Sequence, residues 1–353
     1  MKNEKRLRIG ITHGDINGIG CEVILKTLND LRILEICTPI LYSSPKVIAY
    51  YRKALSLGSL NTQSIRSAVE AQNDKISVVN CLNDEVRVEI GKSTSLGGEA
   101  ALASLELAVS ELKNGIVDAL VTAPIDKSNI QSEKFHFPGH TEYLQSHFGG
   151  EALMLMISDR LRMGILTGHA PLSAVPGMIS QERIISVLRL LNRTMLEDFG
   201  INRPRIAILS LNPHAGDNGV LGDEEQKIII PSIEQAKQEG ILAFGPFASD
   251  GFFGSDNYSK FDVVLSMFHD QGMTAFKTLS FESGVNYTAG LPIIRTSPAH
   301  GTAYDLAGKD LASPDSFRQA LYMACDIAQN RKQYLSLKAN AMKDVEIRNE
   351  SDS

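Results

Sequence analysis

The sequence contains no tryptophan, and aromatic residues make up only 6% of its 353 residues. With so few aromatic rings, a stacking platform for single-stranded nucleic acid is not favoured. An excess of positive charge is also missing, because 35 lysines and arginines stand against 41 aspartates and glutamates, for a net charge of −6. A basic nucleic-acid footprint is therefore not expected. A local cationic pocket for an anionic metabolite remains compatible with this composition.

Cysteines and long apolar runs are scarce as well. The four cysteines are scattered along the chain at Cys21, Cys37, Cys81 and Cys325. They form neither a CxxC pair nor the framework that a small secreted domain needs, so we expect reduced thiols in a cytoplasmic protein. No apolar run approaches the roughly 18–20 residues that span a bilayer. The chain enters a strand pattern at Leu7 without the apolar core of a signal peptide, and no membrane association is expected.

A hydrophobic fraction of 43% and a charged fraction of 22% are ordinary for a globular protein. Because one core rarely grows past about 250–300 residues, we expect two domains or one elaborated domain. Short apolar runs alternate with helical patterns, as in an α/β protein with a largely parallel sheet covered on both faces. The strand candidates are Leu7–Thr12, Pro39–Tyr42, Ile76–Asn80, Val117–Thr122, Leu153–Ile157, Met163–Leu166, Ile206–Leu209 and Val263–Met267.

Four longer segments have the pattern of helices. They span Glu99–Leu112, the residues from Ser180 to Phe199, Asp223–Glu239 and Ser316–Asn330. Ser180 is expected to cap the second of these helices. The acidic first turn of the third suits the helix dipole, and Pro231 is expected to bend it.

Three histidines follow strand candidates, at the edge where parallel α/β sheets bind their ligands. His169 comes after the strand that ends at 166, His214 after the strand that ends at 209, and His269 after the strand that ends at 267. Imidazole is a common ligand of divalent transition metals, and an open fourth position makes such a site catalytic. The wide spacing fits three unrelated loop histidines equally, so both interpretations stay open.

Charged and amide side chains lie near these histidines in the sequence. Asp270 adjoins His269, and Asp250 ends a turn-rich loop, so either carboxylate could face a metal, a substrate or solvent. Lys277, Asn286 and Arg295 together supply a point cation, an amide and a planar guanidinium, which suits a substrate that carries phosphate and carboxylate. Solvent-facing charges are the alternative for these residues.

Two turns marked by glycine or proline are further candidates. The segment Gly14–Gly20 follows a strand and opens a helix, but its spacing is not the GxGxxG fingerprint, and no full P-loop signature is present. It is either a phosphate-binding turn or a tight strand-to-helix connection. His140 and Thr141 follow a Pro-Gly pair and are either ligand contacts or part of a simple chain reversal.

Seven segments, in this order, resemble the 4-hydroxythreonine-4-phosphate dehydrogenase family of pyridoxal phosphate biosynthesis. They are Thr12–Gly20, Val121–Lys127, Pro138–Glu142, Leu211–Gly216, Phe268–Gly272, Ile294–Ser297 and His300–Ala303. The resemblance implies an α/β fold like that of isocitrate and isopropylmalate dehydrogenases, with two α/β domains and a cleft between them. We accordingly expect a nucleotide-side domain at residues 1–125 plus 285–353, and a metal and dimer domain at 126–284.

The resemblance also implies roles for individual residues. A divalent metal (zinc, cobalt or magnesium) would be bound by His169, His214 and His269, with the ligands shared across a homodimer. A small phosphorylated substrate would contact His140, Thr141, Lys277, Asn286 and Arg295, with Asp250 and Asp270 as further contacts near the metal. The loop that begins at His300 resembles the nucleotide-binding loop of isopropylmalate dehydrogenases, so NAD or NADP would contact His300, Gly301, Thr302, Ala303 and Leu306.

The implied activity is NAD(P)-dependent oxidation of 4-phosphooxy-L-threonine at C3, followed by decarboxylation to 3-amino-2-oxopropyl phosphate in pyridoxine 5'-phosphate biosynthesis. The general base stays open between Asp270, His140 and a lysine of a second subunit. One alternative is a sister dehydrogenase for 4-phospho-D-threonate or 4-phospho-D-erythronate. Another is a metal-dependent phosphohydrolase, in which the histidine site would activate water. A non-catalytic metabolite-binding protein is disfavoured, because a sensor needs no open metal position.

Overall fold

One large mixed sheet organises the molecule. The computed structural model describes residues 6–83 and 86–340. In these ranges twelve strands form a single sheet in the order β3-β4-β2-β1-β5-β12-β11-β6-β7-β10-β8-β9. The strands are β1 (Leu7–Thr12), β2 (Cys37–Ser43), β3 (Thr62–Ile65), β4 (Ile76–Asn80), β5 (Ala119–Thr122), β6 (Leu153–Ile157), β7 (Arg162–Ile165), β8 (Arg205–Leu209), β9 (Leu242–Phe247), β10 (Val263–Ser266), β11 (Val285–Ala289) and β12 (Arg295–Pro298).

The helices lie on both faces of this sheet. They are α1 (Gly20–Leu28), α2 (Ile33–Ile36), α3 (Pro45–Ala54), α4 (Ser95–Lys113), α5 (His140–Phe148), α6 (Val175–Met178), α7 (Gln181–Glu197), α8 (Ile230–Gln238), α9 (Ser249–Gly254), α10 (His269–Ser280) and α11 (Asp315–Ala339). Coverage of both faces explains why the strands read as apolar runs rather than alternating ones. Within the described ranges, no helix combines the length and the apolar character that crossing a membrane requires.

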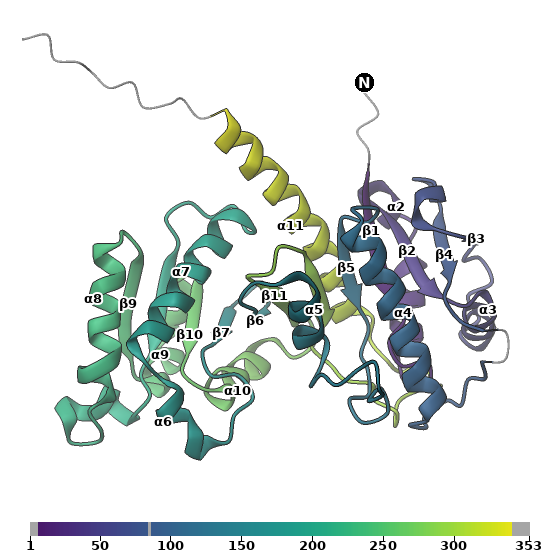
Figure 1. Ribbon diagram of the computed structural model, residues 1–353. Helices are drawn as coiled ribbons and strands as arrows, with labels where there is room; N and C mark the ends of the chain where they lie inside the picture. The colour runs from purple at the N-terminus through teal and green to yellow at the C-terminus, as the bar shows by residue number, and fades with distance from the viewer. Residues whose placement is uncertain (1–5, 84–85, 341–353) are drawn as a thin grey trace, which may run out of the picture.

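The sheet consists of two parallel blocks joined by an antiparallel centre. Strand β11 pairs antiparallel with both β12 and β6, and β6 pairs antiparallel with β7, whereas the remaining neighbours are parallel. Figure 1 shows the result as two lobes, one built from β1 to β5 with α1 to α4 and the other from β7 to β10 with α6 to α10. The predicted α/β class is confirmed. The predicted domain limits, 1–125 plus 285–353 and 126–284, stay a prediction.

The apolar strands were predictable, whereas the polar ones were not. All eight strand candidates correspond to observed strands, and three of them have the predicted limits: Leu7–Thr12, Ile76–Asn80 and Leu153–Ile157. Strands β3, β9, β11 and β12 were not predicted. The sequences of β3 and β12, TQSI and RTSP, lack apolar periodicity, and β9 contains a Gly-Pro pair that reads as a turn.

Helix ends follow the expected capping chemistry. The hydroxyl of Ser180 accepts a hydrogen bond from the amide of Arg183 at 3.2 Å, so the predicted cap of α7 is confirmed. The predicted helix over 223–239 is instead a π-helical turn at Glu225–Ile229 followed by α8, whose first turn contains Pro231. Proline fits there because the first helical amides have no partner inside the helix.

Candidate active site

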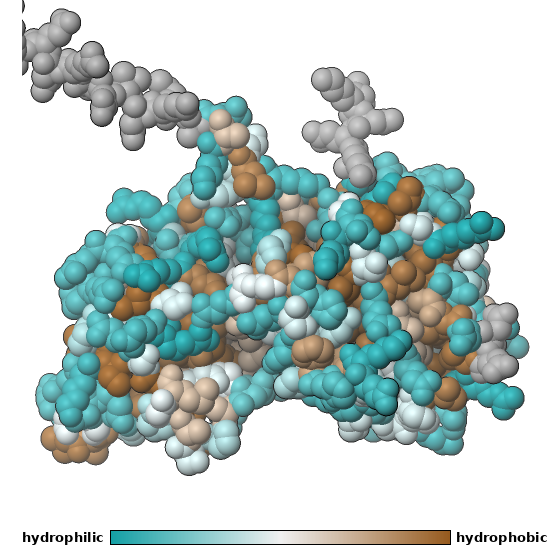
Figure 2. All heavy atoms as spheres, viewed as in Figure 1, coloured by the Kyte–Doolittle hydropathy of each residue, from teal (hydrophilic) through white to brown (hydrophobic). Residues whose placement is uncertain are grey.

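A cavity of about 740 Å³ is lined by residues of α5, β6, β11 and β12 and of the loop after β7, and it gathers most of the predicted substrate residues. In the space-filling view the molecule is hollowed between the lobes along its lower edge (Figure 2). The predicted residues that line this cavity are His140, Thr141, His169, Asn286 and Arg295. Three charged residues that were not predicted also line it: Lys127, Glu142 and Arg183. The signal for Lys127 was its place in a loop that directly follows a strand, as for the histidines.

Arg295 is the most constrained charge in this cavity. It opens β12, and its side chain is bound by hydroxyls, with Thr122 Oγ1 at 2.9 Å from Nε and 2.7 Å from Nη2, and Thr288 Oγ1 at 3.2 Å from Nη1. The residue is only 4% exposed, and burial lowers the pKa of its guanidinium to about 10. The charge of Glu142, which lines the same cavity, offsets part of this lowering of the pKa. A buried cation that lines a cavity and is hydrogen-bonded within the protein by hydroxyl groups is suited to bind an anion.

His140 lies beside this guanidinium as the first residue of α5. Burial, followed by the positive charges of Arg295 and Lys127, lowers the pKa of its imidazole well below the ordinary value, so the ring is neutral at pH 7. Its Nε2 atom is buried and has no hydrogen-bond partner within the described residues, and the same is true of Asn286 Oδ1. Buried polar atoms are almost always paired. Two orphaned atoms in one cavity therefore indicate that a polar ligand completes the site.

His169 and His269 lie next to each other. Their ring centroids are 5.0 Å apart, with 37° between the ring planes. Burial and then the neighbouring His269 lower the pKa of His169, so it favours the neutral form that binds metals. Nδ1 of His269 is 2.7 Å from Asp270 Oδ1, which leaves Nε2 of His269 free. A carboxylate on the second ring nitrogen is the usual orienting partner of a metal-bound imidazole.

His214 does not join these two histidines. It lines a separate cavity of about 700 Å³ together with Asp250 and Asp270. In the described part of the chain, no group of three or more histidine, cysteine, aspartate or glutamate side chains is placed to hold a metal ion. The structure therefore brings together two of the three predicted ligands, and the predicted three-histidine site stays a prediction.

The turn that carries His214 is strained. His214, Ala215, Gly216, Asp217 and Asn218 all have positive φ, between 42° and 77°, which L-residues other than glycine adopt at a cost. The buried carboxylate of Glu225 fixes the start of this turn, because Oε1 accepts the amides of Leu211 and Asn212 at 2.8 Å each. Strain of this kind persists only where the surroundings over-determine it, and it is common at functional sites.

Lys277 is not brought to either cavity. It is exposed on α10 and lines neither the cavity that contains Arg295 nor the one that contains His214. Its predicted contact with substrate stays a prediction.

The predicted nucleotide loop packs against the Gly14–Gly20 turn. The amide of Ile19 donates to the carbonyl of Thr302 at 3.0 Å, and a Cβ atom on Gly18 would lie 2.7 Å from that carbonyl oxygen. A Cβ on Gly14 would overlap the carbonyl oxygen of Pro124. Close backbone contacts therefore require glycine at both positions of this turn. Of the two interpretations of this turn, the tight strand-to-helix connection is the one that the structure favours.

The loop itself leaves room for a ligand. His300 Nε2 is buried without a hydrogen-bond partner in the described ranges, and no atom lies within 4 Å of a Cβ built on Gly301. The five predicted cofactor contacts lie together in this one segment, which follows β12: His300, Gly301, Thr302, Ala303 and Leu306. Tyr304, which was not predicted, anchors the loop by donating from its hydroxyl to Asp15 Oδ2 at 2.8 Å.

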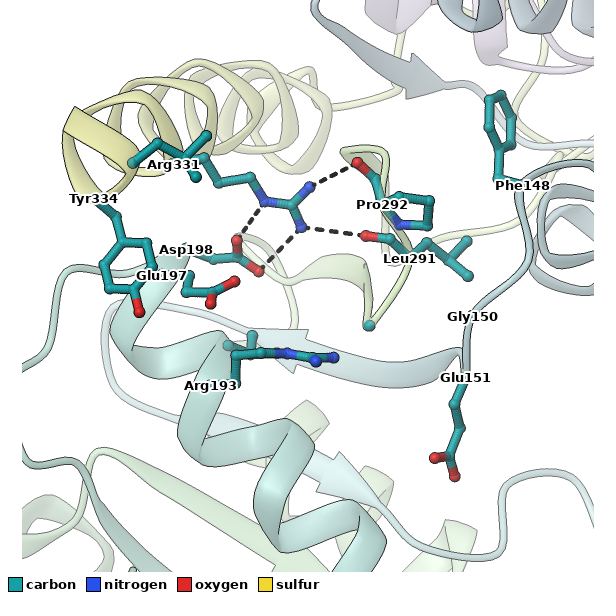
Figure 3. Close-up of a pocket in the computed structure, with 13 residues that line it drawn as sticks. Phe148, Gly150, Glu151, Arg193, Glu197, Asp198, Leu291, Pro292, Arg331 and Tyr334 are labelled. Carbon is teal, nitrogen blue, oxygen red and sulfur yellow. Dashed lines mark hydrogen bonds and ion pairs between the residues drawn. The ribbon is translucent and has the colours of Figure 1, made fainter. Parts of the chain in front are cut away.

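A third cavity, of about 580 Å³, is lined by residues of α7 and α11, by the segment before β6 and by the loop after β11 (Figure 3). Its wall includes Arg331 of α11, whose guanidinium binds Asp198 at 2.5 Å and also reaches the backbone carbonyls of Leu291 and Pro292. Glu151 belongs to this cavity and forms an ion pair with Arg183, which lines the cavity of Arg295. Arg331 differs from Arg295 in having a carboxylate partner, so its charge is compensated inside the protein.

Comparison with known proteins identifies relatives along nearly the whole chain. Residues 35–324 match the family model described as pyridoxal phosphate biosynthetic protein PdxA. A 4-hydroxythreonine-4-phosphate dehydrogenase from Bacteroides thetaiotaomicron is 52% identical over 353 residues, which cover 99% of this chain and 97% of that protein. A relative from Oceanobacillus iheyensis that carries a D-threonate 4-phosphate dehydrogenase name is 36% identical and covers 93% of this chain and 99% of its own length.

Solved structures give the same result. The crystal structure of 4-hydroxythreonine-4-phosphate dehydrogenase from Klebsiella pneumoniae aligns with a TM-score of 0.80 at 32% identity and covers 93% of this chain and 100% of that chain. Isocitrate dehydrogenase from Methylococcus capsulatus aligns with a TM-score of 0.50 at 11% identity over 94% of this chain and 89% of that one, which supports a shared fold alone.

Proposed function

This chain belongs to the PdxA family of pyridoxal phosphate biosynthetic proteins, and from that premise we propose that it is a 4-hydroxythreonine-4-phosphate dehydrogenase. The reaction removes a hydride from C3 of 4-phosphooxy-L-threonine and a proton from its hydroxyl, with NAD+ or NADP+ as the hydride acceptor. The bond from C2 to the carboxylate then breaks, CO2 leaves, and protonation at C2 gives 3-amino-2-oxopropyl phosphate. The observation that carries this proposal is Arg295, a buried cation that lines a cavity and is hydrogen-bonded within the protein by hydroxyl groups.

The cavity supplies charge and hydrogen bonds that match such a substrate. Arg295 binds one anionic end, and Lys127 and Arg183 add positive charge around the same space. Neutral His140 and the amide of Asn286 contact polar groups of the substrate through the atoms that lack internal partners. Positioning of this kind can contribute several kcal/mol to catalysis, because it removes the entropy cost of bringing reactants together.

A divalent metal fits the donor set at the edge of this cavity. His169 and His269 would hold it through neutral ring nitrogens, and Asp270 orients His269. Because His214 of the same chain lies in a separate cavity, we propose that the third imidazole comes from the partner subunit of a homodimer. Imidazole donors suit zinc or cobalt better than magnesium. Such an ion supplies Lewis-acid polarisation of the substrate hydroxyl and of the carbonyl that replaces it.

The nicotinamide cofactor would contact the segment from His300 to Leu306. The buried, unpartnered Nε2 of His300 and the open space at Gly301 support this placement. Tyr304 and the carbonyl of Thr302 fix the segment to the Gly14–Gly20 turn, so the loop is held in place before a nucleotide binds. We further propose that the enzyme works in the cytoplasm, where both the cofactor and a phosphorylated substrate are available.

A second candidate substrate is D-threonate 4-phosphate, because a relative at 36% identity carries that name. The decisive experiment offers the purified enzyme with zinc or cobalt to 4-phosphooxy-L-threonine and to 4-phospho-D-threonate, and follows NADH or NADPH by absorbance. The proposal predicts that the amino acid substrate gives the larger kcat/KM. Preference for the D-threonate compound would assign the enzyme to the sister activity, and phosphate release without nicotinamide reduction would contradict both.

A further inference from the structure

The side-chain amide of Gln271 uses all three of the hydrogen bonds that it forms to connect different segments of the chain. Its Nε2 donates to the carbonyl oxygen of Ser210 at 2.7 Å and to the hydroxyl of Ser249 at 2.7 Å. Its Oε1 accepts from the amide of Met267 at 2.8 Å. The partners fix the orientation of the amide, because a carbonyl oxygen can only accept and a backbone N–H can only donate.

These three segments carry His214, Asp250 and His269, whereas His169 lies on another segment, after β7. Ser210 follows β8 and begins the segment that leads into the His214 turn. Ser249 is the first residue of α9 and precedes Asp250, and Met267 lies between β10 and the first residue of α10, His269. Gln271 itself lines the cavity that contains His214. One planar group therefore sets the relative position of segments that are distant in sequence.

We propose that Gln271 is a positioning residue that holds the segments of His214, Asp250 and His269 in the geometry that metal binding requires. This inference rests on the proposed function, since His269 and His214 of one chain serve the two different metal sites of the proposed dimer, and Gln271 aligns the ligands of both. The strained turn explains why the three hydrogen bonds of the Gln271 side chain are needed. Residues 214–218 all have positive φ, and the segment before them is fixed by Gln271 through Ser210 and by Glu225 through Leu211 and Asn212.

The three hydrogen bonds of residue 271 require a side-chain amide of the length of glutamine. Two donors and one acceptor must point from one planar group, and among the natural side chains only an amide provides them. Methionine has a similar length and provides none of these hydrogen bonds. Glutamate preserves the acceptor for Met267 but loses both donors and places an acceptor oxygen against the carbonyl of Ser210. Alanine in place of Ser249 removes the bond to α9 alone.

The test measures Co2+ binding by the visible absorption of the ion in the absence of substrate, so its readout is independent of turnover. Gln271→Met and Gln271→Glu are expected to weaken Co2+ binding about 10- to 100-fold, as is typical when an orienting group behind a metal ligand is removed. Ser249→Ala is expected to lie between them and the wild type. Gln333→Met, the same change at an exposed glutamine of α11, is the matched control and is expected to bind as the wild type does.

Circular dichroism and thermal unfolding establish that each variant is folded. Wild-type affinity and an unchanged cobalt spectrum in folded Gln271→Met would overturn the inference. If Gln271→Met does not fold, Ser249→Ala becomes the deciding variant, because it removes only one hydrogen bond. Unchanged Co2+ affinity in Ser249→Ala would then overturn the inference. Failure of the wild type to bind Co2+ at all would instead contradict the proposed function, so the two failures are distinguishable.

Discussion

Replacing Arg295 with methionine tests whether this buried arginine binds an anionic ligand at a cost to the stability of the unliganded protein. Its guanidinium is 4% exposed and is bound by hydroxyls, and burial lowers its pKa from 12.5 to about 10. At about 1.4 kcal/mol for each tenfold change in the proton equilibrium, that drop means that the fold disfavours the charged form by about 3 kcal/mol. The cost is fully present below about pH 10, where the folded protein carries the charge.

Without ligand, Arg295→Met is therefore expected to be more stable than the wild type by roughly 1–3 kcal/mol. The gain is smaller than the full cost of the buried charge, because Thr122 and Thr288 lose a hydrogen-bond partner. Thermal unfolding at pH 7 should show an increase in Tm of roughly 1–4 °C. With a phosphorylated substrate, the loss of charge-assisted hydrogen bonds worth about 2–3 kcal/mol should raise KM roughly 30- to 150-fold. Arg295→Lys keeps the charge without the planar fork, so KM should rise with no gain in Tm.

Arg331→Met is the matched control, because this arginine has a buried carboxylate partner, Asp198. Its removal leaves that carboxylate unpaired and is expected to destabilise the protein by about 3–5 kcal/mol. Opposite effects on stability at the two positions would support the assignment of Arg295 to ligand binding. Destabilisation of the unliganded Arg295→Met protein together with an unchanged KM would refute it.

Three further predictions concern the framework around the site. His13 is fully buried, and burial lowers its pKa to about 4, so between pH 6.5 and 4 the unfolded chain binds a proton that the folded one does not. The free energy of unfolding should therefore fall by up to about 3 kcal/mol as the pH drops through this range. Chemical unfolding of the wild type and of His13→Gln at several pH values measures this difference. Glu225→Ala leaves the partly buried amides of Leu211 and Asn212 without this partner and should cost about 1–3 kcal/mol and weaken Co2+ binding, whereas an unchanged urea midpoint would exclude an anchoring role. Ser180→Ala removes the cap of α7 and should cost about 1 kcal/mol in the same urea assay, with no effect on kcat/KM.

The sequence predicted those parts of the fold that depend on local pattern. Apolar runs identified eight of the twelve strands, and the hydroxyl before α7 identified its cap. The polar strands β11 and β12 were missed, because their side chains carry the site: Asn286 and Thr288 alternate with buried Tyr287 along β11, and Arg295 opens β12. Polar residues of the site occupy positions where an apolar side chain would have indicated a strand, so the sequence of these strands resembles that of a loop.

The candidate site was predicted as a set of residues but not as a geometry. Position after a strand selected His169, a Pro-Gly turn selected His140, and the combination of its charge with Lys277 and Asn286 selected Arg295. The fold brings these three residues to one cavity. No local signal could show that His214 lies in a different cavity of the same chain, because that depends on how segments distant in sequence pack. The hydrogen bonds of Gln271 could likewise not be predicted from the sequence, because one of its partners, Ser210, lies 61 residues away in the chain.

The proposed sharing of metal ligands between two subunits can be tested with heterodimers of inactive variants. When His169 and His269 of one chain share a metal with His214 of the other, purified heterodimers of His169→Ala and His214→Ala chains contain one intact site and should recover about half of the wild-type activity and bind one Co2+. Heterodimers of His169→Ala and His269→Ala chains contain no intact site and should stay inactive. Recovery in the second pair but not the first, or in neither, would contradict the account.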